Sequence, residues 1–360
     1  MEDNSLYAVI MAGGSGTRFW PMSLCERPKQ LVTWEAGSPT FLQATVQRLS
    51  GFVKDSNSWL VVHESQVEGS RAVLPSIPAA QFLAEPIQRN TAAAIGLAAL
   101  HLQVKDPDSV MIVLPADHHV GAPQALCDAL AEAARIARDN YIVTLGIEAN
   151  KPETGYGYIR RGDALGACAF EVAEFLEKPN LELAKEFVAS GKHSWNAGMF
   201  VCRPKIILDE IQRQLPDLSS GLGVLEEALR EAGRISDELL REIYASLPSV
   251  SIDYGVMEGA EKVAVIPVDC GWSDVGSFDA LPDVFEADLE GNVRRGRTIS
   301  MDNKNCTLIA TDGGVVSALG CENLIVVHTQ KATLVLPREM GQRVRDVVKV
   351  IEENKWQDLL

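Results

Sequence analysis

Apolar residues recur in two alternating patterns over about the first 150 residues of the chain. The first is a short continuous apolar run, typical of a strand covered on both faces of a sheet, and it occurs at residues 7–11, 59–62, 81–83, 110–114 and 142–145. The second is a longer helical pattern at residues 40–49, 91–104 and 123–137, the first of which opens with Thr40 as a candidate N-cap. Strands and helices in alternation predict a doubly wound α/β sheet.

The pattern changes twice further along the chain. Residues 151–281 are less regular, with strand-like stretches at 156–160 and 199–202 and helical patterns at 181–189, 205–214 and 237–245. From Asp288 onward, short β-type runs recur about every 8 to 10 residues with Gly, Asn or Asp between them, at residues 298–300, 307–309, 315–317, 324–327 and 333–335. This spacing predicts a small all-β appendage.

The sequence ends on an amphipathic helical pattern at residues 342–353. It places Val344, Val347, Val348 and Ile351 on one face, so we expect this helix to pack back on the body of the protein. The chain thus divides into a main α/β domain at residues 1–287 and a β appendage with the terminal helix at residues 288–360, although no low-complexity linker separates them.

The net charge limits the partners that the chain can have. With 33 Lys and Arg against 49 Asp and Glu, the formal net charge is −16, so nucleic acid and anionic membrane surfaces would be repelled on average. The longest apolar stretches, such as residues 91–100, are far shorter than the roughly 20 residues of a membrane span, and residues 1–5 are too polar for a signal peptide. The seven cysteines, an odd number without a Cys-x-x-Cys pair, are expected to be reduced packing residues. We therefore expect a cytoplasmic protein with no nucleic-acid or membrane partner.

A glycine-rich loop follows the first predicted strand directly. It consists of Gly13, Gly14, Ser15, Gly16 and Thr17. Such a loop brings backbone amides close to an anion, although it could also be a plain strand-to-helix turn. It lacks the Gly-Lys-Ser/Thr of a P-loop, and Phe19 stands where a dinucleotide-binding loop has its third Gly or Ala. Because Arg18 and Lys29 follow closely, we expect the two cations to close over a polyphosphate.

Two aspartates are candidate metal ligands. Asp117 follows the carboxyl end of the predicted strand at residues 110–114, which is where open α/β sheets bind ligands, and Asp274 lies far along the chain in a turn-rich segment. Carboxylates that converge on one point suit Mg²⁺, which binds through a few carboxylates, waters and phosphate oxygens. The alternative is that each aspartate caps a helix.

Motifs in a fixed order carry a resemblance to a known family. They are GGSGTRFWP at 13–21, RPKQL at 27–31, EPIQRNTA at 85–92, LPADH at 114–118, GYGYI at 155–159, FLEKP at 175–179, WNAGMF at 195–200, SIDYGVME at 251–258 and GWSDVGS at 271–277. In these motifs the sequence resembles the sugar-1-phosphate nucleotidylyltransferases over essentially its whole length. Within that superfamily it is most similar to the guanylyltransferases that act on mannose 1-phosphate. The resemblance implies a Rossmann-like, doubly wound mixed sheet followed by a β-helix-like appendage.

The resemblance also implies an activity and roles for particular residues. The activity would be transfer of a guanylyl group from GTP to α-D-mannose 1-phosphate, giving GDP-mannose and pyrophosphate by in-line attack on the α-phosphorus, with Mg²⁺ as cofactor. Arg18 and Lys29 would be catalytic, and Asp117 and Asp274 would hold the metal. The nucleotide base would be read by Glu85, Asn90 and Thr91, and the sugar phosphate would be bound by Gly155, Glu177, Lys178 and Asn196.

Several alternatives stay open from the sequence. Asn90 could simply cap a helix, and Asp253 could support the metal or the sugar or cap a helix. The same fold also serves uridylyl or thymidylyl transfer to another hexose 1-phosphate, or a non-catalytic sensor of nucleotide sugars. A homodimer is possible. Two-function relatives carry a further cupin domain that adds phosphomannose isomerase activity, and the sequence stops before such a domain, so we expect guanylyl transfer alone.

Overall fold

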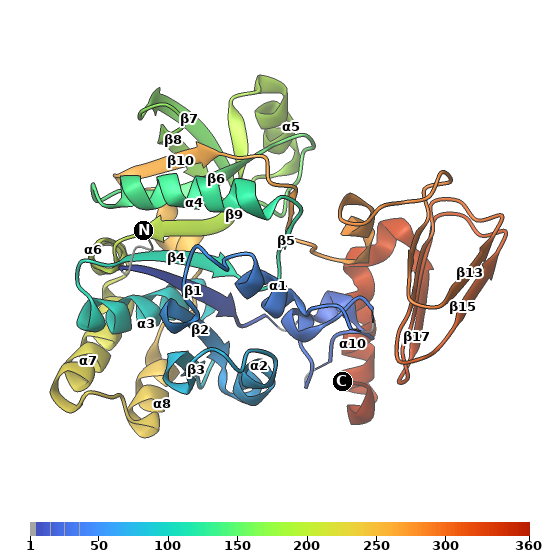
Figure 1. Cartoon of the computed structure of the whole chain (residues 1–360), viewed down its shortest axis with the longest axis horizontal. Helices are drawn as coiled ribbons and strands as arrows, with labels where there is room; N and C mark the ends of the chain where they lie inside the picture. Colours follow the sequence, from blue (N-terminus) through green and yellow to red (C-terminus); the bar gives the residue numbers. More distant parts are fainter. Residues whose placement is uncertain (1–4, 15, 25, 36) are drawn as a thin grey trace.

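A nine-stranded mixed sheet forms the body of the protein in a computed structural model that describes residues 5–14, 16–24, 26–35 and 37–360. The strand order is β3-β2-β1-β4-β9-β6-β10-β8-β7. Figure 1 shows this sheet and its helices on one side of the molecule and a smaller β-rich part on the other. The predicted strand–helix alternation is therefore present, and it continues beyond residue 150 into an antiparallel half of the same sheet.

The first half of the sheet is parallel and buried on both faces. It comprises β1 (Leu6–Ala12), β2 (Ser58–His63), β3 (Phe82–Glu85) and β4 (Val110–Pro115), with β1 paired in parallel to both β2 and β4. Along β1, Tyr7 and Val9 enter one apolar cluster while Leu6 and Ala8 enter another, as the alternation of side chains along a strand requires. This two-sided burial explains why the predicted strands appear as continuous apolar runs.

The second half of the sheet is largely antiparallel. β9 (His193–Cys202) runs antiparallel to both β4 and β6 (Ile142–Glu148), while β10 (Val263–Pro267) is parallel to β6. β7 (Tyr158–Ala164) and β8 (Phe170–Leu176) complete the edge, and β5 (His119–Val120) pairs with β11 (Trp272–Ser273) outside the sheet. The sequence predicted β6, β7 and β9, but it did not reveal β8 or β10.

Helices cover both faces of the sheet. They are α1 (Phe41–Gln47), α2 (Val67–Val73), α3 (Asn90–Lys105), α4 (Pro123–Ala137), α5 (Leu181–Ser190), α6 (Pro204–Gln214), α7 (Pro216–Ala232), α8 (Asp237–Ser246) and α9 (Ile252–Gly255). The alanine-rich α3 packs with α6 and α7 on one face, whereas α4 packs on the other. Thr40 caps α1 as predicted, since its hydroxyl accepts from the amide of Gln43 at 3.1 Å while the Gln43 side chain accepts from the amide of Thr40 at 2.9 Å. Within the described ranges, no helix has the length and apolar content needed to cross a membrane.

The C-terminal part is a stack of short, mostly parallel strands. Its strands are β12 (Val293–Arg295), β13 (Thr298–Met301), β14 (Thr307–Ala310), β15 (Val316–Leu319), β16 (Leu324–His328) and β17 (Thr333–Pro337). β12, β14 and β16 pair in parallel in one sheet, β13 and β15 pair in parallel in a second, and β17 closes the first sheet antiparallel. This is the all-β appendage that the spacing of the runs predicted.

The last helix, α10 (Val344–Glu353), packs back on the body as predicted. One apolar cluster joins Val344, Val348 and Ile351 of α10 to Phe19 and Trp20 of the N-terminal segment, and it also includes apolar residues of β14, β16 and β17. Figure 1 shows α10 between these two regions. The predicted helical face was wrong at one position, because the side chain of Val347 is exposed, and the helix begins at residue 344 after a 3-10 turn at Arg338–Arg343.

Candidate active site

The candidate site lies at the carboxyl edge of the parallel half of the sheet. Because β3, β2, β1 and β4 are neighbours and run the same way, the segments that follow β1, β3 and β4 meet at one edge. These segments carry the glycine loop, the stretch from Glu85 to Thr91, and Asp117. The strand order explains how residues about a hundred positions apart come to line one cavity.

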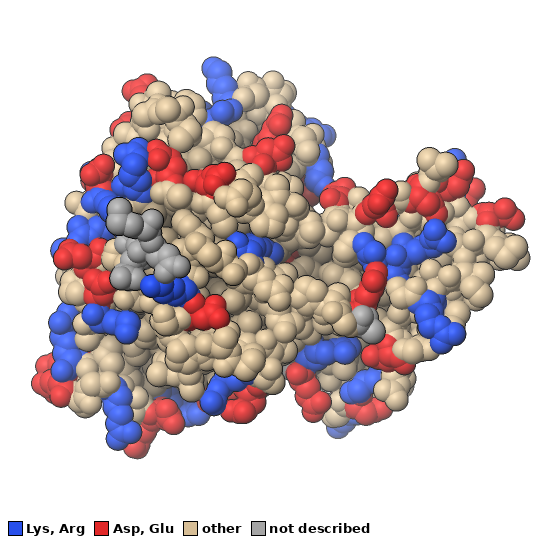
Figure 2. Space-filling model, viewed as in Figure 1, with Lys and Arg blue, Asp and Glu red and all other residues tan. Residues whose placement is uncertain are grey.

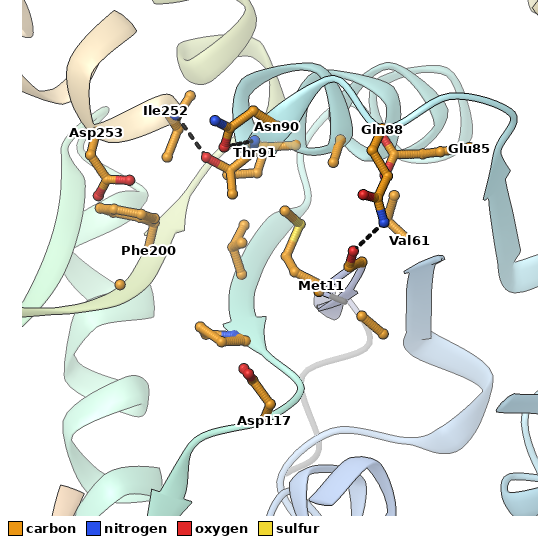
Figure 3. Close-up of a pocket in the computed structure, with 18 of the residues that line it drawn as sticks. Met11, Val61, Glu85, Gln88, Asn90, Thr91, Asp117, Phe200, Ile252 and Asp253 are labelled. Carbon is orange, nitrogen blue, oxygen red and sulfur yellow. Dashed lines mark hydrogen bonds between the residues drawn. The ribbon is translucent and has the colours of Figure 1, made fainter. Parts of the chain in front are cut away.

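Two cavities open at this edge. The large cavity, of about 590 Å³, is lined by Gly13, Gly14, Glu85, Asn90, Thr91, Asp117, Gly198 and Asp253, among others (Figure 3). The small cavity, of about 430 Å³, is lined by Gly14, Gly16, Thr17, Arg18, Lys29, Asp117, Asp274 and Gly276, among others. Gly14, Asp117 and His118 border both, so the two cavities share a wall.

Lys29 lines the small cavity and links two of its other lining residues. Its Nζ donates to Oδ2 of Asp117 at 2.8 Å and to the backbone carbonyl of Asp274 at 2.8 Å, across 88 and 245 residues of sequence. The Lys29 side chain is only 8% exposed and lies against the rings of Phe19 and Phe41. Burial raises the pKa of Asp117, but the charges of Lys29 and His118 and the hydrogen bonds to the carboxylate together outweigh burial, and the net pKa is lowered. Asp117 is therefore an anion held by a fixed cation.

Gly16 fixes the position of Lys29. Its backbone is left-handed, with φ 63°, and a Cβ there would lie 2.6 Å from Cβ of Lys29 and 2.7 Å from Oγ of Ser23. Only glycine allows the loop to approach the lysine so closely. Gln88 closes the other side of the loop by donating from its side chain to the carbonyl of Gly13. Ser15, which the sequence analysis also placed in the anion loop, lies outside the described residues.

Asp274 is oriented by its neighbours. Its Oδ1 accepts from the hydroxyl of Tyr156 at 2.7 Å and from the amide of Gly276 at 3.1 Å. Burial and the Asp274 charge together raise the pKa of Tyr156, so the phenol stays protonated and keeps donating. The sequence analysis missed Tyr156, although the residue stands inside the motif at 155–159. Arg18, in contrast to Lys29, is exposed and makes no hydrogen bond or ion pair with any residue that the structure describes.

The start of α3 forms one wall of the large cavity. Asn90 has a left-handed backbone, with φ 64°, and its side-chain oxygen accepts from the amide of Thr91 at 2.8 Å. The Thr91 hydroxyl accepts from the amide of Ile252 at 2.8 Å, so α3 and α9 are joined here, and Figure 3 shows both bonds. Asn90 is the first residue of α3, whose N-cap is Arg89, and its side chain is exposed, with no hydrogen bond from its amide nitrogen to the residues that the structure describes.

Glu85 lies at the opposite end of the same cavity from Asp253 (Figure 3). Its side chain is buried, and burial raises the pKa of this carboxyl to about 7, against an opposing influence of the hydroxyl of Tyr244. No cation of the described residues pairs with it. Arg89, a residue the sequence analysis quoted but did not assign, donates through Nε to the carbonyl of Tyr244 at 2.7 Å and thereby ties α8 to the start of α3.

A second polar cluster lies beside the large cavity. Nδ2 of Asn196, on β9, donates to Oδ1 of Asp253 at 2.9 Å, and Asp253 lines the cavity. Glu177 is buried and accepts from Nζ of Lys178 at 2.6 Å. Burial and the nearby Glu177 raise the pKa of Asp253 to about 6. The structure thus brings Glu177, Lys178 and Asn196 together, as the resemblance implied.

The glycine of this cluster is not the one that the sequence analysis selected. Gly155 is exposed, and its amide donates to Oε1 of Glu153 at 3.4 Å. Gly157, two residues on, packs directly against Glu177 and Asn196: a Cβ at Gly157 would collide with Oε2 of Glu177 and lie 3.3 Å from Cβ of Asn196. Its carbonyl also accepts from the amide of Asn196 at 2.8 Å. Close approach to these two side chains therefore depends on Gly157.

Comparisons with known proteins agree with this architecture. A family described as nucleotidyl transferase matches residues 7–291, and one described as MannoseP isomerase/GMP-like beta-helix domain matches residues 296–351. A solved structure from Thermus thermophilus, named a mannose-1-phosphate geranyltransferase, has a TM-score of 0.87 and 38% identity, and the match covers 97% of this chain and 99% of that one. The predicted fold class is confirmed.

Curated relatives narrow the assignment. Mannose-1-phosphate guanylyltransferase ManC of Salmonella typhimurium is 41% identical over 99% of this chain and 74% of its own length. The mannose-1-phosphate guanylyltransferase of Klebsiella pneumoniae is 39% identical over 97% of this chain and 74% of its own length. The chain therefore belongs to the nucleotidyl transferases, in the family of the mannose-1-phosphate guanylyltransferases.

Proposed function

We propose that this protein transfers a guanylyl group from GTP to α-D-mannose 1-phosphate and releases GDP-mannose and pyrophosphate. The names of its relatives support the substrates. The observation that carries the proposal is the contact of Lys29 with both Asp117 and Asp274 in the small cavity, because Asp117 also borders the large cavity. Nucleotidyl transfer needs a group that neutralises phosphate charge between the space that binds the base and the space that binds the phosphates.

The reaction needs no protein nucleophile. A phosphate oxygen of the sugar phosphate attacks the α-phosphorus of GTP, the new P–O bond forms as the bond to the bridging oxygen breaks, and pyrophosphate leaves with that oxygen. The protein contributes position and charge. The amides of the glycine loop, the fixed ammonium of Lys29 and the exposed guanidinium of Arg18 would stabilise the leaving pyrophosphate.

The two ends of the site would fix the substrates. Glu85, Asn90 and Thr91 border the large cavity, which fits their proposed role at the guanine edge, where a carboxylate can accept from N1–H and the N2 amine. Glu177 and Asn196 would accept and donate hydrogen bonds to sugar hydroxyls, and Lys178 would pair with the sugar phosphate. Gly155 stays a proposed backbone contact of the sugar, although the structure gives the closer packing to Gly157.

Asp117 and Asp274 fit a magnesium ion by their chemistry. Both carboxylates line the small cavity, and Oδ2 of Asp274 faces Gly276, where a Cβ would lie only 3.0 Å away. Among the residues that the structure describes, no group of three or more His, Cys, Asp or Glu could hold a metal ion alone. This suits Mg²⁺, which usually takes one or two carboxylates together with waters and substrate phosphates. When bound, Mg²⁺ would neutralise phosphate charge.

The positive charge that binds the substrates would be confined to the site. On the face in Figure 2, Lys and Arg side chains lie interspersed with Asp and Glu, in keeping with a net charge of −16. Two anionic substrates would therefore be held by the cations that line the small cavity and by Lys178, not by the surface as a whole. We further propose that the enzyme is cytoplasmic, in the compartment where GTP is made. The homodimer stays a prediction, which light scattering can test.

A substrate matrix tests the proposal. Pyrophosphate release is measured with GTP, ATP, UTP, CTP and dTTP, each against mannose 1-phosphate, glucose 1-phosphate and galactose 1-phosphate, with and without Mg²⁺. We expect the highest kcat/KM for GTP with mannose 1-phosphate. A preference for UTP or dTTP with glucose 1-phosphate would overturn the substrate assignment, and no turnover with any pair would favour the sensor alternative.

A further inference from the structure

One cation of the small cavity comes from the C-terminal part of the chain. Arg345, the second residue of α10, lines this cavity together with Arg18, Lys29, Asp117 and Asp274. Its side chain is exposed and makes no hydrogen bond or ion pair with the residues that the structure describes. The sequence analysis did not select it, because the resemblance placed the reaction in the main domain.

The position of Arg345 is fixed by the packing of its helix. On either side of it along α10, Val344 and Val348 are buried in the cluster that includes Phe19 and Trp20. Phe19, a member of this cluster, directly follows Arg18 in the chain. As Figure 1 shows, α10 lies against the N-terminal segment rather than on the far side of the β appendage.

Hydrogen bonds tie both ends of this region to the site. Nε2 of Gln342, just before α10, donates to Oγ of Ser277 at 2.7 Å, three residues after Asp274. At the other end, Nε1 of Trp20 donates to the carbonyl of Leu359 at 2.8 Å. The helix is thus held to the two segments that carry Asp274 and Arg18, so Arg345 is placed at the cavity and is not a side chain on a loose tail.

The charges around Arg345 leave it free for a ligand. The carboxylates that share its cavity are already engaged, since Asp117 binds Lys29 at 2.8 Å and Asp274 accepts from Tyr156 at 2.7 Å. On α10 itself, Asp346 is bound by Nε of Arg343 at 3.0 Å. A guanidinium with no partner in the described ranges, beside a second one on Arg18, is an arrangement that favours an oligophosphate with several anionic oxygens.

We propose that Arg345 binds the outer phosphates of the nucleotide, which become the pyrophosphate product, so that the C-terminal part completes the active site. Arg18 and Arg345 then hold the leaving group from two different parts of the chain. The proposal rests on the proposed function only in taking an oligophosphate as ligand. It does not depend on which base or sugar is used.

Direct binding of magnesium pyrophosphate tests the proposal without any nucleotide or sugar. Isothermal titration calorimetry compares the full-length protein with Arg345→Ala, Arg345→Lys and the control Arg343→Ala, which removes one charge from the same region but not from the cavity. For Arg345→Ala we expect about a 5- to 20-fold higher Kd, below the loss of a fully buried charged hydrogen bond because the side chain is exposed. Arg345→Lys should recover part of the affinity, and Arg343→Ala should match the wild type.

Kinetics give a second readout. In the forward reaction Arg345→Ala should raise the KM for GTP and leave the KM for mannose 1-phosphate unchanged, and in the reverse reaction it should raise the KM for pyrophosphate. Equal pyrophosphate affinity in Arg345→Ala and Arg343→Ala, or no binding of pyrophosphate by the wild type, overturns the role of Arg345. If the wild type prefers another nucleotide while Arg345→Ala still loses pyrophosphate affinity, the proposed substrates are wrong and the role of Arg345 stands.

Discussion

The two lysines of the site are held in different ways. Lys29 is 8% exposed in its side chain, and its ammonium is bonded to Asp117 and to the carbonyl of Asp274. Lys178 is 51% exposed, and Glu177 is the one acidic side chain of the described residues that it pairs with, at 2.6 Å. Lys29 is therefore a buried side chain whose ammonium makes two hydrogen bonds, whereas Lys178 is an exposed side chain with a single carboxylate partner.

Because Lys29 and Lys178 are held differently, we expect substitutions at the phosphate end and at the sugar end of the site to have different kinetic effects. At the phosphate end, which is the small cavity, changes to Lys29, Asp117 or Asp274 disturb the network that faces the reacting phosphates, so they should lower kcat. Changes at the sugar end remove a contact that binds substrate and transition state equally, so they should raise KM.

The largest effect is expected from the two aspartates of the phosphate end. Asp117→Asn and Asp274→Asn should each lower kcat by roughly a hundredfold or more, because each removes a charged ligand of the proposed metal while keeping the shape of the side chain. Steady-state pyrophosphate release measures the loss, and thermal unfolding shows whether the fold persists.

Chelation provides the matched control. EDTA should reduce the wild type to the level of these variants, and added Mg²⁺ should restore the wild type but not the variants. Full turnover of the wild type in metal-free buffer would exclude the metal role of both carboxylates.

Lys29→Met tests how much the contacts of Lys29 contribute to the stability of the fold. It keeps the length of the side chain but leaves Asp117 without its cation, so the free energy of unfolding should fall. Breaking a fully buried ion pair typically lowers the free energy of unfolding by about 3–5 kcal/mol. The loss here should be smaller, since the Asp117 side chain is 33% exposed. Chemical denaturation measures this, and kcat should fall as well.

Two further variants sharpen the comparison of the lysines. Lys29→Met combined with Asp117→Asn should recover stability relative to Lys29→Met alone, because no unpaired charge remains. Lys178→Met should destabilise less than Lys29→Met, because it removes one hydrogen bond of an exposed ammonium whereas Lys29→Met removes two from a buried one. An equal loss of stability at both lysines would mean that the two are held alike, and the comparison would fail.

A smaller effect is expected at the sugar end. Lys178→Ala should raise the KM for mannose 1-phosphate by about 10- to 100-fold, which corresponds to about 1.5–3 kcal/mol for a lost charged hydrogen bond. Arg18→Ala should instead mainly lower kcat. If both variants changed the same kinetic constant, the proposed division of roles between the phosphate end and the sugar end would be wrong.

The sequence predicts one half of this site better than the other. Strands 1 to 4 and the loops after them were predictable, because each strand is a continuous apolar run and parallel neighbours must place their carboxyl ends together. The motifs then fixed Lys29, Asp117 and Glu85 near that edge. β10 was missed although residues 263–267 are apolar, because nothing local shows that this short run pairs with β6, some 120 residues earlier.

The residues that sequence analysis missed depend on long-range packing. Tyr156 becomes relevant only because its hydroxyl reaches Asp274, 118 residues away, and Arg345 only because α10 packs on Phe19 and Trp20. The motif GYGYI alone does not show which of its two glycines, Gly155 or Gly157, packs closely against other side chains. The collision that a Cβ at Gly157 would have with Glu177 separates them, and that contact is a property of the folded sheet.

The smallest effect concerns two carboxylates of the site, Asp117, which is partly buried, and Glu85, which is buried. Lys29 lowers the pKa of Asp117, whereas burial without a paired cation raises the pKa of Glu85 to about 7 from its ordinary 4.5. Between pH 4.5 and 7 the folded protein thus holds a proton on Glu85 that the unfolded chain has lost, so this group's contribution to stability falls as the pH rises through that range. Glu85→Gln should remove that part of the pH dependence of unfolding.

The same titration should appear in nucleotide binding. Only the ionised Glu85 can accept from both guanine donors, and about a tenth of it is ionised at pH 6 against about nine tenths at pH 8, so the KM for GTP should rise up to about tenfold as the pH falls from 8 to 6. The protonation of GTP itself contributes to this rise, and Glu85→Gln measures that contribution, because it cannot titrate. If the KM of the wild type and the KM of Glu85→Gln changed in parallel with pH, Glu85 would not titrate where the base binds. Asp117 and Glu85 would then differ less in protonation than their surroundings suggest.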